Sequence, residues 1–340
     1  MPQPENRHMI VVSCGDPGGI GGEILLKALA AGASDLPVLL ALPFGLARAW
    51  LGVLQAPREW QPRVWHADAE PPEKGLWCLP DEPGWPAVRF PAVAAVDAHS
   101  GLLAWRSLER AVDLVLENPG QRALVTAPIH KLAMHEAGFR WPGHTEYLEE
   151  RGGKGPGLMW MHGPRLSVGL LCNHLPIKDV AAAVTASTLA HKIRLACAFL
   201  RDHGIDDELR VLGLDPHAGD GGAIGTADRD LLAPCIAGLR AGGLPASGPW
   251  PADAALARGH GRFLAMYHDQ GLPVFKLVEG GQGVNLTLGL PFVRVSPDHG
   301  TAFDIAGKGQ ADPASMITAL ATATRLLRAR NAPRKTEEPA

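Results

Sequence analysis

The sequence lacks the glycine-rich fingerprints of the common nucleotide-binding domains. It contains neither G-x-G-x-x-G nor G-x-x-x-x-G-K-[ST], so a Rossmann domain or a P-loop has no support. Its 5 cysteines are scattered without a C-x-x-C pair, which argues against a disulfide framework or a cysteine zinc site. It shows no signal-peptide core and no apolar run as long as a membrane span. We therefore expect a cytoplasmic protein without membrane contact.

A strong charge of either sign is also missing. The formal net charge is −3 and like charges form only short runs, so the basic patch required for nucleic-acid binding is not expected. Hydrophobic residues make up 46% of the chain, as in ordinary globular proteins. A length of 340 residues is enough for two domains.

Buried strand patterns alternate with helical patterns along the chain. "HMIVVSC" and "LPVLLALP" are typical of strands, and "SGLLAWRSLERAVDLVLENPG" is typical of an amphipathic helix. The proline-rich residues 52–98 suggest loops and short strands. This alternation predicts an α/β fold whose sheet is largely parallel and covered on both faces.

Three predicted strands end in the same way. "SVGLLCNHLP", "RVLGLDPHAGDGG" and "FLAMYHDQGLP" each present a histidine and then a Pro or Gly, at His174, His217 and His268. Ligands of α/β sheets bind outside the carboxyl ends of strands, and three imidazoles with open positions are typical of a catalytic metal site. A single histidine in this position more often caps a loop. Three in the same context favour a divalent metal.

Cationic and polar residues follow the third strand. Lys276 and Arg294 interrupt apolar runs that we interpret as strands, "PVFKLV" and "PFVRVS", and Asn285 lies between them. A buried cation needs a partner, which is either a protein carboxylate or an anionic ligand. The cluster His144-Thr145-Glu146 marks a helix start, where Thr145 is an N-cap candidate with or without an anion.

Eight motifs resemble the 4-hydroxythreonine-4-phosphate dehydrogenase family and occur in the family's order between residues 15 and 309. They are "GDPGGIGGE", "TAPIHK", "GHTEYL", "HLPIKDV", "DPHAGDGG", "MYHDQGLP", "GVNLTLGLPFVR" and "DHGTAFDIAGKG". The last also resembles the adenosine-binding loop of the isocitrate/isopropylmalate dehydrogenase superfamily. The sequence departs from the family pattern around Asp253, where "PADAALARGHGRF" lacks the usual threonine, and this bears on the substrate.

The resemblance implies two α/β domains with a cleft between them, isocitrate/isopropylmalate dehydrogenase-like. The cofactor-side domain would comprise 8–125 plus 290–330, and the central metal, substrate and dimerisation domain 126–289. Residues 1–7 and 331–340 are polar and are expected to be disordered. The family assembles as a homodimer whose active site is completed across the interface.

The resemblance also assigns residues. It implies a divalent metal (Zn, Mg or Co) on His174, His217 and His268. It implies substrate contacts from His144, Thr145, Lys276, Asn285, Arg294 and Asp253. NAD, or NADP, would contact the loop residues His299, Gly300, Thr301, Ala302 and Asp304. The reaction would be NAD-dependent oxidation of 4-phosphooxy-L-threonine at C3 and decarboxylation to 3-amino-2-oxopropyl phosphate, with Lys276 and Asp269 as candidate proton acceptors.

Three alternatives remain open at this point. The same fold and chemistry would serve D-threonate or D-erythronate 4-phosphate, or a terephthalate dihydrodiol. A metal-dependent hydrolase or aldolase would explain the histidines but leave "DHGTAFDIAGKG" without a role. A non-catalytic relative is disfavoured because all three proposed ligands are present.

Overall fold

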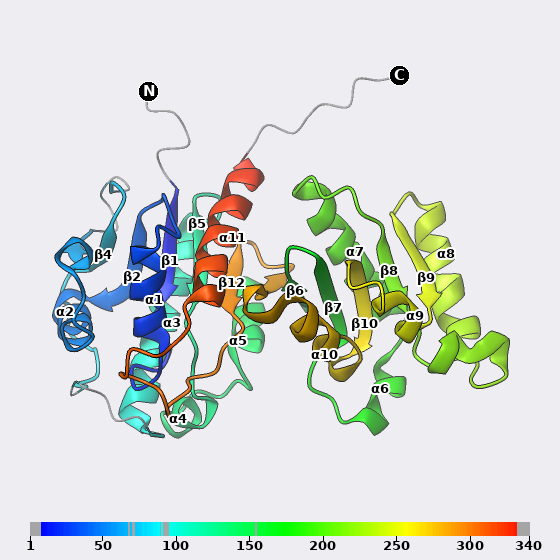
Figure 1. Cartoon of the computed structure of the whole chain (residues 1–340), viewed down its shortest axis with the longest axis horizontal. Coiled ribbons are helices and arrows are strands. Elements are labelled where there is room, and N and C mark those ends of the chain that lie inside the picture. Colours follow the sequence, from blue (N-terminus) through cyan, green and yellow to red (C-terminus); the bar gives the residue numbers. More distant parts are fainter. Residues whose placement is uncertain are drawn as a thin grey trace, which may run out of the picture. The chain divides into compact units, whose positions relative to one another are not determined.

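The computed structural model describes residues 8–66, 69, 72–88, 90, 95–153 and 155–331 (Figure 1). Residue 331 ends the last helix, so it departs from the disorder expected there. The rest of the ends expected to be disordered, 1–7 and 332–340, lies outside the described residues. Among the described residues no helix combines the length and hydropathy that crossing a bilayer requires.

The chain divides into two compact units. Unit 1 holds the described residues up to Pro142, Pro291–Val295 and those from His299 onward; unit 2 holds Gly143–Leu290 and Ser296–Asp298. Unit 1 is therefore built from both ends of the sequence, and unit 2 is nearly continuous. The assignment of a cofactor role and a metal role to separate domains stays a prediction.

Unit 1 has parallel strand pairing in the order β3-β4-β2-β1-β5-β12. Its strands are β1 (Met9–Ser13), β2 (Val38–Pro43), β3 (Arg63–Val64), β4 (Leu76–Leu79), β5 (Arg122–Thr126) and the first half, Arg294 and Val295, of β12 (Arg294–Pro297). All residues of β1, β2 and β5 are buried, which explains their continuous apolar sequences. The α/β class predicted from the sequence is confirmed.

Helices pack on these strands. They are α1 (Gly21–Ala30), α2 (Phe44–Val53), the short 3-10 helix Arg58–Trp60, α3 (Ala98–Glu117), α4 (Lys131–Glu136) and α11 (Ala314–Asn331). The Asp97 side chain caps α3 by accepting from the backbone N–H groups of His99 and Ser100. α11 contacts α1 and β5, and Figure 1 shows it in front of β5 and β12. α3 contacts β1, β2 and β5.

Unit 2 has the strand order β11-β6-β7-β10-β8-β9. Its strands are β6 (Leu158–His162), β7 (Leu166–Cys172), β8 (Leu209–Leu212), β9 (Ala246–Trp250), β10 (Gly261–Tyr267) and β11 (Val284–Leu288). β7, β10, β8 and β9 pair in parallel, whereas β6 is antiparallel to both β7 and β11. The prediction of a largely parallel sheet is therefore confirmed with β6 as an exception.

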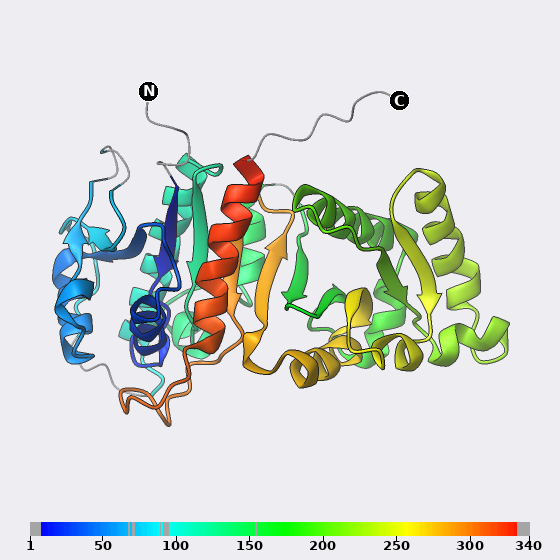
Figure 2. The same ribbon diagram turned by 45° about the horizontal axis from the view of Figure 1, so that its top comes forward.

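Both faces of β7 are covered. The helical segments of unit 2 are α5 (His144–Gly152), α6 (Ile177–Ala183), α7 (Ala186–Asp202), the turn segment η3 (Pro216–Gly222), the π-helical segment Asp228–Leu232, α8 (Ala233–Ala241), α9 (Ala252–Leu256), α10 (His268–Glu279) and the 3-10 segment Gly280–Gln282. Val168 of β7 and Phe275 of α10 belong to one apolar core. On the other face, Trp160 of β6 packs beside Gly169 and meets Phe199 of α7. Figure 2 shows α7 and α10 on different sides of these strands.

Two local predictions are wrong. Lys276 lies in α10 and not in a strand, and its side chain is 56% exposed, so it is not a buried cation. The N-cap of α5 is Gly143, and Thr145 is the second residue of the helix. Arg294 does lie in a strand, β12, and is buried.

Candidate active site

The three histidine-bearing strands of unit 2 end at the same edge of the sheet. β10 pairs in parallel with β7, with Tyr267 opposite Cys172, and in parallel with β8, with Leu264 opposite Val211. Their carboxyl ends therefore point the same way, which is the geometry required for the histidines to converge.

Two of the predicted metal ligands lie close together. The ring centroids of His174 and His268 are 5.9 Å apart. Their proximity follows from the register of β7 and β10. Cys172 pairs with Tyr267, and His174 and His268 come two residues and one residue later. Among the described residues of this single chain, no three His, Cys, Asp or Glu side chains form a metal-binding group. His217 is therefore not brought into a triad with the other two within one copy.

The geometry around His268 suits a metal ligand. Its Nδ1 lies 2.6 Å from Oδ1 of Asp269. A carboxylate on one ring nitrogen fixes the tautomer and directs the other nitrogen, Nε2, towards a ligand. The donor type and this arrangement fit a divalent cation. The described side chain of Asp269 is 81% exposed.

His217 begins a left-handed turn. The φ angles of His217, Ala218 and Asp220 are 55°, 53° and 44°, and Gly219 and Gly221 between and after them are also positive. A left-handed conformation costs about 1–2 kcal/mol for each non-glycine residue. Such strain persists where surrounding contacts hold it, and it is concentrated at functional sites.

The predicted substrate residues of unit 2 lie on several elements. His144 and Thr145 form the first turn of α5, and Asp253 is exposed in α9. Lys276 Nζ lies 3.4 Å from Oδ2 of Asp298. Oδ1 of Asn285, on β11, is buried and has no hydrogen-bond partner among the described residues.

Arg294 belongs to unit 1. Its Nη2 donates to Oγ1 of Thr126 over 2.8 Å. Burial lowers the pKa of the Arg294 guanidinium to about 10, because the charged form loses its hydration. The group remains protonated at neutral pH, so it offers a buried positive charge next to a strand end.

The predicted cofactor loop packs on the N-terminal glycine-rich turn within unit 1. The backbone N–H of Ile20 donates to the Thr301 carbonyl over 3.0 Å. A Cβ on Gly19 would lie only 2.9 Å from that carbonyl oxygen, so the contact requires glycine. Ala302 has a φ of 43°, and the buried Nε2 atom of the half-buried His299 has no hydrogen-bond partner among the described residues. Gly300 and Asp304 lie on the same loop.

Several residues around this loop were missed by the sequence analysis. The Phe303 ring stacks on His130 at 5.3 Å. Glu23 Oε1 accepts from the Ala311 N–H over 2.8 Å, and Lys27 donates to the Gly309 and Ala311 carbonyls. The i,i+4 spacing of Glu23 and Lys27 could have predicted their ion pair. Nothing in the sequence indicates that Glu23 also binds the backbone of Ala311, 288 residues away.

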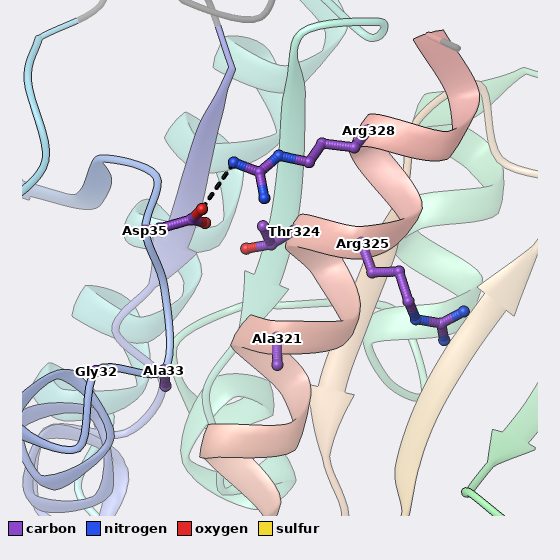
Figure 3. A pocket seen from close by; sticks show the side chains of 7 residues that line it. All are labelled: Gly32, Ala33, Asp35, Ala321, Thr324, Arg325 and Arg328. Carbon is purple, nitrogen blue, oxygen red and sulfur yellow. Dashed lines mark hydrogen bonds and ion pairs between the residues drawn. The ribbon is translucent and has the colours of Figure 1, made fainter.

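One surface pocket lies away from these residues. It has a volume of about 370 Å³ and is lined by Gly32, Ala33, Asp35, Ala321, Thr324, Arg325 and Arg328 (Figure 3). Asp35 and Arg328 form an ion pair of 2.8 Å across it, and this hydrogen bond lowers the pKa of the Asp35 carboxyl. No predicted site residue lines the pocket.

Comparison with known proteins identifies relatives over nearly the whole chain. Residues 73–323 match the family described as "Pyridoxal phosphate biosynthetic protein PdxA". A 4-hydroxythreonine-4-phosphate dehydrogenase of Acidithiobacillus ferrooxidans is 40% identical over 333 residues, covering 95% of this chain and 97% of the relative.

Solved structures of similar proteins also cover nearly the whole chain. A 4-hydroxythreonine-4-phosphate dehydrogenase from Klebsiella pneumoniae has a TM-score of 0.81 and 34% identity, covering 94% of this chain and 98% of that one. A terephthalate 1,2-cis-dihydrodiol dehydrogenase from Burkholderia xenovorans has a TM-score of 0.67 and 27% identity, with 94% and 98% coverage.

Proposed function

The chain belongs to the PdxA family, and on that premise we propose that it is a 4-hydroxythreonine-4-phosphate dehydrogenase. It is an NAD-dependent oxidoreductase that oxidises the C3 hydroxyl of 4-phosphooxy-L-threonine. The β-keto acid then loses CO₂ and gives 3-amino-2-oxopropyl phosphate for pyridoxal phosphate biosynthesis. The observation that carries the proposal is the 40% identity to a relative of that name over 95% of this chain.

A divalent cation is proposed on His174, His217 and His268. The close approach of the His174 and His268 rings and the carboxylate on His268 Nδ1 support it. When bound, such a cation supplies Lewis-acid polarisation of the oxygen at the reacting carbon. The neutral imidazoles leave its positive charge uncompensated, which suits that task.

The anionic substrate is proposed to be held by Arg294 and Lys276, with His144, Thr145, Asn285 and Asp253 as further contacts. The buried guanidinium of Arg294 is a natural partner for phosphate or carboxylate, and the Lys276 side chain adds a hydrogen-bonding contact. Their role is to orient the C3–H bond towards the nicotinamide.

NAD is proposed to lie against the loop that contains His299, Gly300, Thr301, Ala302 and Asp304. The cofactor accepts the hydride, and the protein supplies its orientation. The packing of this loop on the glycine-rich turn through Gly19 and Ile20 supports a rigid binding surface. Of the two nicotinamide cofactors, NAD and NADP, we propose NAD.

Lys276 is the proposed proton acceptor. Of the two candidates, Asp269 has Oδ1 engaged with His268, which supports a role in orienting that ring. A proton acceptor must come within hydrogen-bond reach of the substrate hydroxyl. Lys276 Nζ lies 3.4 Å from Oδ2 of Asp298, and its side chain is 56% exposed, so this amine is not tied to a proposed metal ligand.

A homodimer is proposed to complete the site. Large apolar side chains of unit 2 are exposed on the segments that carry proposed site residues: Leu175 (48%), Ile177 (69%), Ile224 (51%) and Leu277 (85%). Exposed apolar groups of this kind mark association surfaces. We expect Ile177→Asp and Leu277→Asp to produce monomers in analytical ultracentrifugation. Val53→Asp, on α2 of unit 1 with 43% exposure, is the matched control and should leave the dimer intact.

The function is tested by NADH formation with metal-loaded protein. 4-Phosphooxy-L-threonine would be compared with D-threonate 4-phosphate, D-erythronate 4-phosphate and the terephthalate dihydrodiol. Turnover of the first substrate, lost in His217→Ala, is the expected result. Preferred turnover of another substrate would overturn the pathway, and no NADH from any of them would favour a hydrolase or aldolase.

A further inference from the structure

The side-chain amide of Gln270 joins the helix start at His268 to the end of a different strand. Gln270 lies in the first turn of α10, and its Oε1 accepts from the Met266 N–H over 2.7 Å. Its Nε2 donates to the Gly213 carbonyl over 2.7 Å. Gly213 directly follows β8, which leads into the turn that carries His217.

The next two peptides of that segment are held by a second side chain. The carboxylate of Asp228 accepts from the N–H groups of Leu214 and Asp215, each over 2.9 Å. Asp228 is only 1% exposed, so both bonds are accepted by a buried carboxylate. One carbonyl and two consecutive N–H groups are thus fixed immediately before His217.

We propose that Gln270 is a positioning residue that fixes the His268 helix start relative to the segment leading into the His217 turn, so that each copy presents both imidazoles in a set arrangement at the carboxyl edge of its sheet for binding of divalent cations. The proposal rests on the metal site of the proposed function. It assigns Gln270 a role through the histidines and not through contact with substrate.

The chemistry of the side chain explains why glutamine is needed. One end must accept a hydrogen bond and the other must donate one, and an amide does both without charge. Glutamate would keep the acceptor for Met266 but would face the Gly213 carbonyl with an oxygen. Groups that orient metal ligands typically contribute about 10–100-fold to metal affinity.

If Gln270 stabilised only the fold, replacing it would give a different result. Its loss would lower the stability of the protein but leave the ligand arrangement of bound metal unchanged. The absorption spectrum of bound Co²⁺ reports that arrangement, because its visible bands depend on the geometry and number of ligands. The spectrum therefore separates the two roles.

The experiment uses the full-length Gln270→Glu protein titrated with Co²⁺ against a competing chelator. We expect affinity to fall by about 10–100-fold and the visible spectrum to change. Gln282→Glu, which introduces the same charge at an exposed position of unit 2, should match the wild type. Wild-type affinity and spectrum in Gln270→Glu would overturn the positioning role.

Two further measurements keep the result interpretable. If Gln270→Glu does not fold, Asp228→Asn removes one acceptor from the same segment and should weaken Co²⁺ binding, with the exposed neighbour Asp230→Asn as control. Unchanged Co²⁺ binding in folded Asp228→Asn would overturn the proposal. Wild-type protein that binds no Co²⁺, or His217→Ala that binds it normally, would overturn the metal site itself and the positioning role with it.

Discussion

Oδ1 of Asp269 lies 2.6 Å from Nδ1 of His268, its neighbour in the chain and the first residue of α10. This pairing predicts the effect of Asp269→Asn. Asparagine can still accept from the ring but without a negative charge, so metal affinity should fall by about 10-fold. The pH profile of kcat should keep its shape. Loss of the fall in kcat at low pH, with unchanged metal affinity, would instead identify Asp269 as the proton acceptor.

The two ends of β10 provide a matched pair of histidine substitutions. His268 follows the strand, and the exposed His260 precedes it with Nδ1 near the Arg258 carbonyl. His268→Ala should abolish metal binding measured by chelator competition and lower kcat by a factor on the order of 100 or more. His260→Ala should change neither. Equal effects of both substitutions would contradict the site at the carboxyl edge.

The left-handed turn predicts opposite effects at two adjacent positions. Ala218→Gly removes a side chain that disfavours a φ of 53°, so it should raise the free energy of unfolding by about 1 kcal/mol. Gly219→Ala should lower it, because a Cβ there would lie 2.6 Å from the Gly225 carbonyl oxygen. Chemical denaturation measures both. Stabilisation by Gly219→Ala would show that the turn is not held as described.

Replacing Arg294 by methionine should separate substrate binding from folding. A buried guanidinium pays a large desolvation cost, and an apolar side chain of similar length avoids it. We expect the stability of Arg294→Met to equal or exceed that of the wild type. Its KM for the phosphorylated substrate should rise by about 10–100-fold, since a charged hydrogen bond is lost. An unchanged KM would remove Arg294 from the substrate site.

Asp16 predicts a pH-dependent stability difference. Its Oδ1 accepts from the Gly18 N–H over 2.9 Å, and burial raises the pKa of its carboxyl above 3.8. The folded state therefore holds this proton more tightly than the unfolded state, and ionisation costs stability as the pH rises through the folded pKa. Asp16→Asn should raise the melting temperature at neutral pH. The difference should shrink as the pH falls towards 3.8, and a variant less stable at neutral pH would contradict this.

Sequence reasoning located the residues whose signals are local. The apolar strands before His174 and His268 and the break after each are visible in short windows, and the register then brings the rings together. The run around Lys276 was misread because a short apolar stretch has no period that separates a strand from a buried helix. It forms the α10 face that packs on β7, although Pro273 lies inside the helix.

Contacts between distant segments carried no signal in the sequence. Gln270 and Gly213 are 57 positions apart, and their hydrogen bond exists only because β8 and β10 are paired. The left-handed turn at His217 was likewise invisible, because "DPHAGDGG" indicates a break but not its handedness. The choice of Gly143 over Thr145 as the cap of α5 depends on backbone conformation that residue preference alone does not determine.

The hydrogen bond between the Glu23 side chain and the Ala311 N–H bears on the order of folding during synthesis on the ribosome. The two residues are 288 positions apart, and a ribosome adds about 5–20 residues per second. Glu23 therefore emerges roughly 15–60 s before its partner exists. The nearly continuous unit 2 is translated in that interval, whereas unit 1 still awaits β12 and α11. Helix α1, which carries Glu23, is thus translated early but is among the last elements to form its tertiary hydrogen bonds.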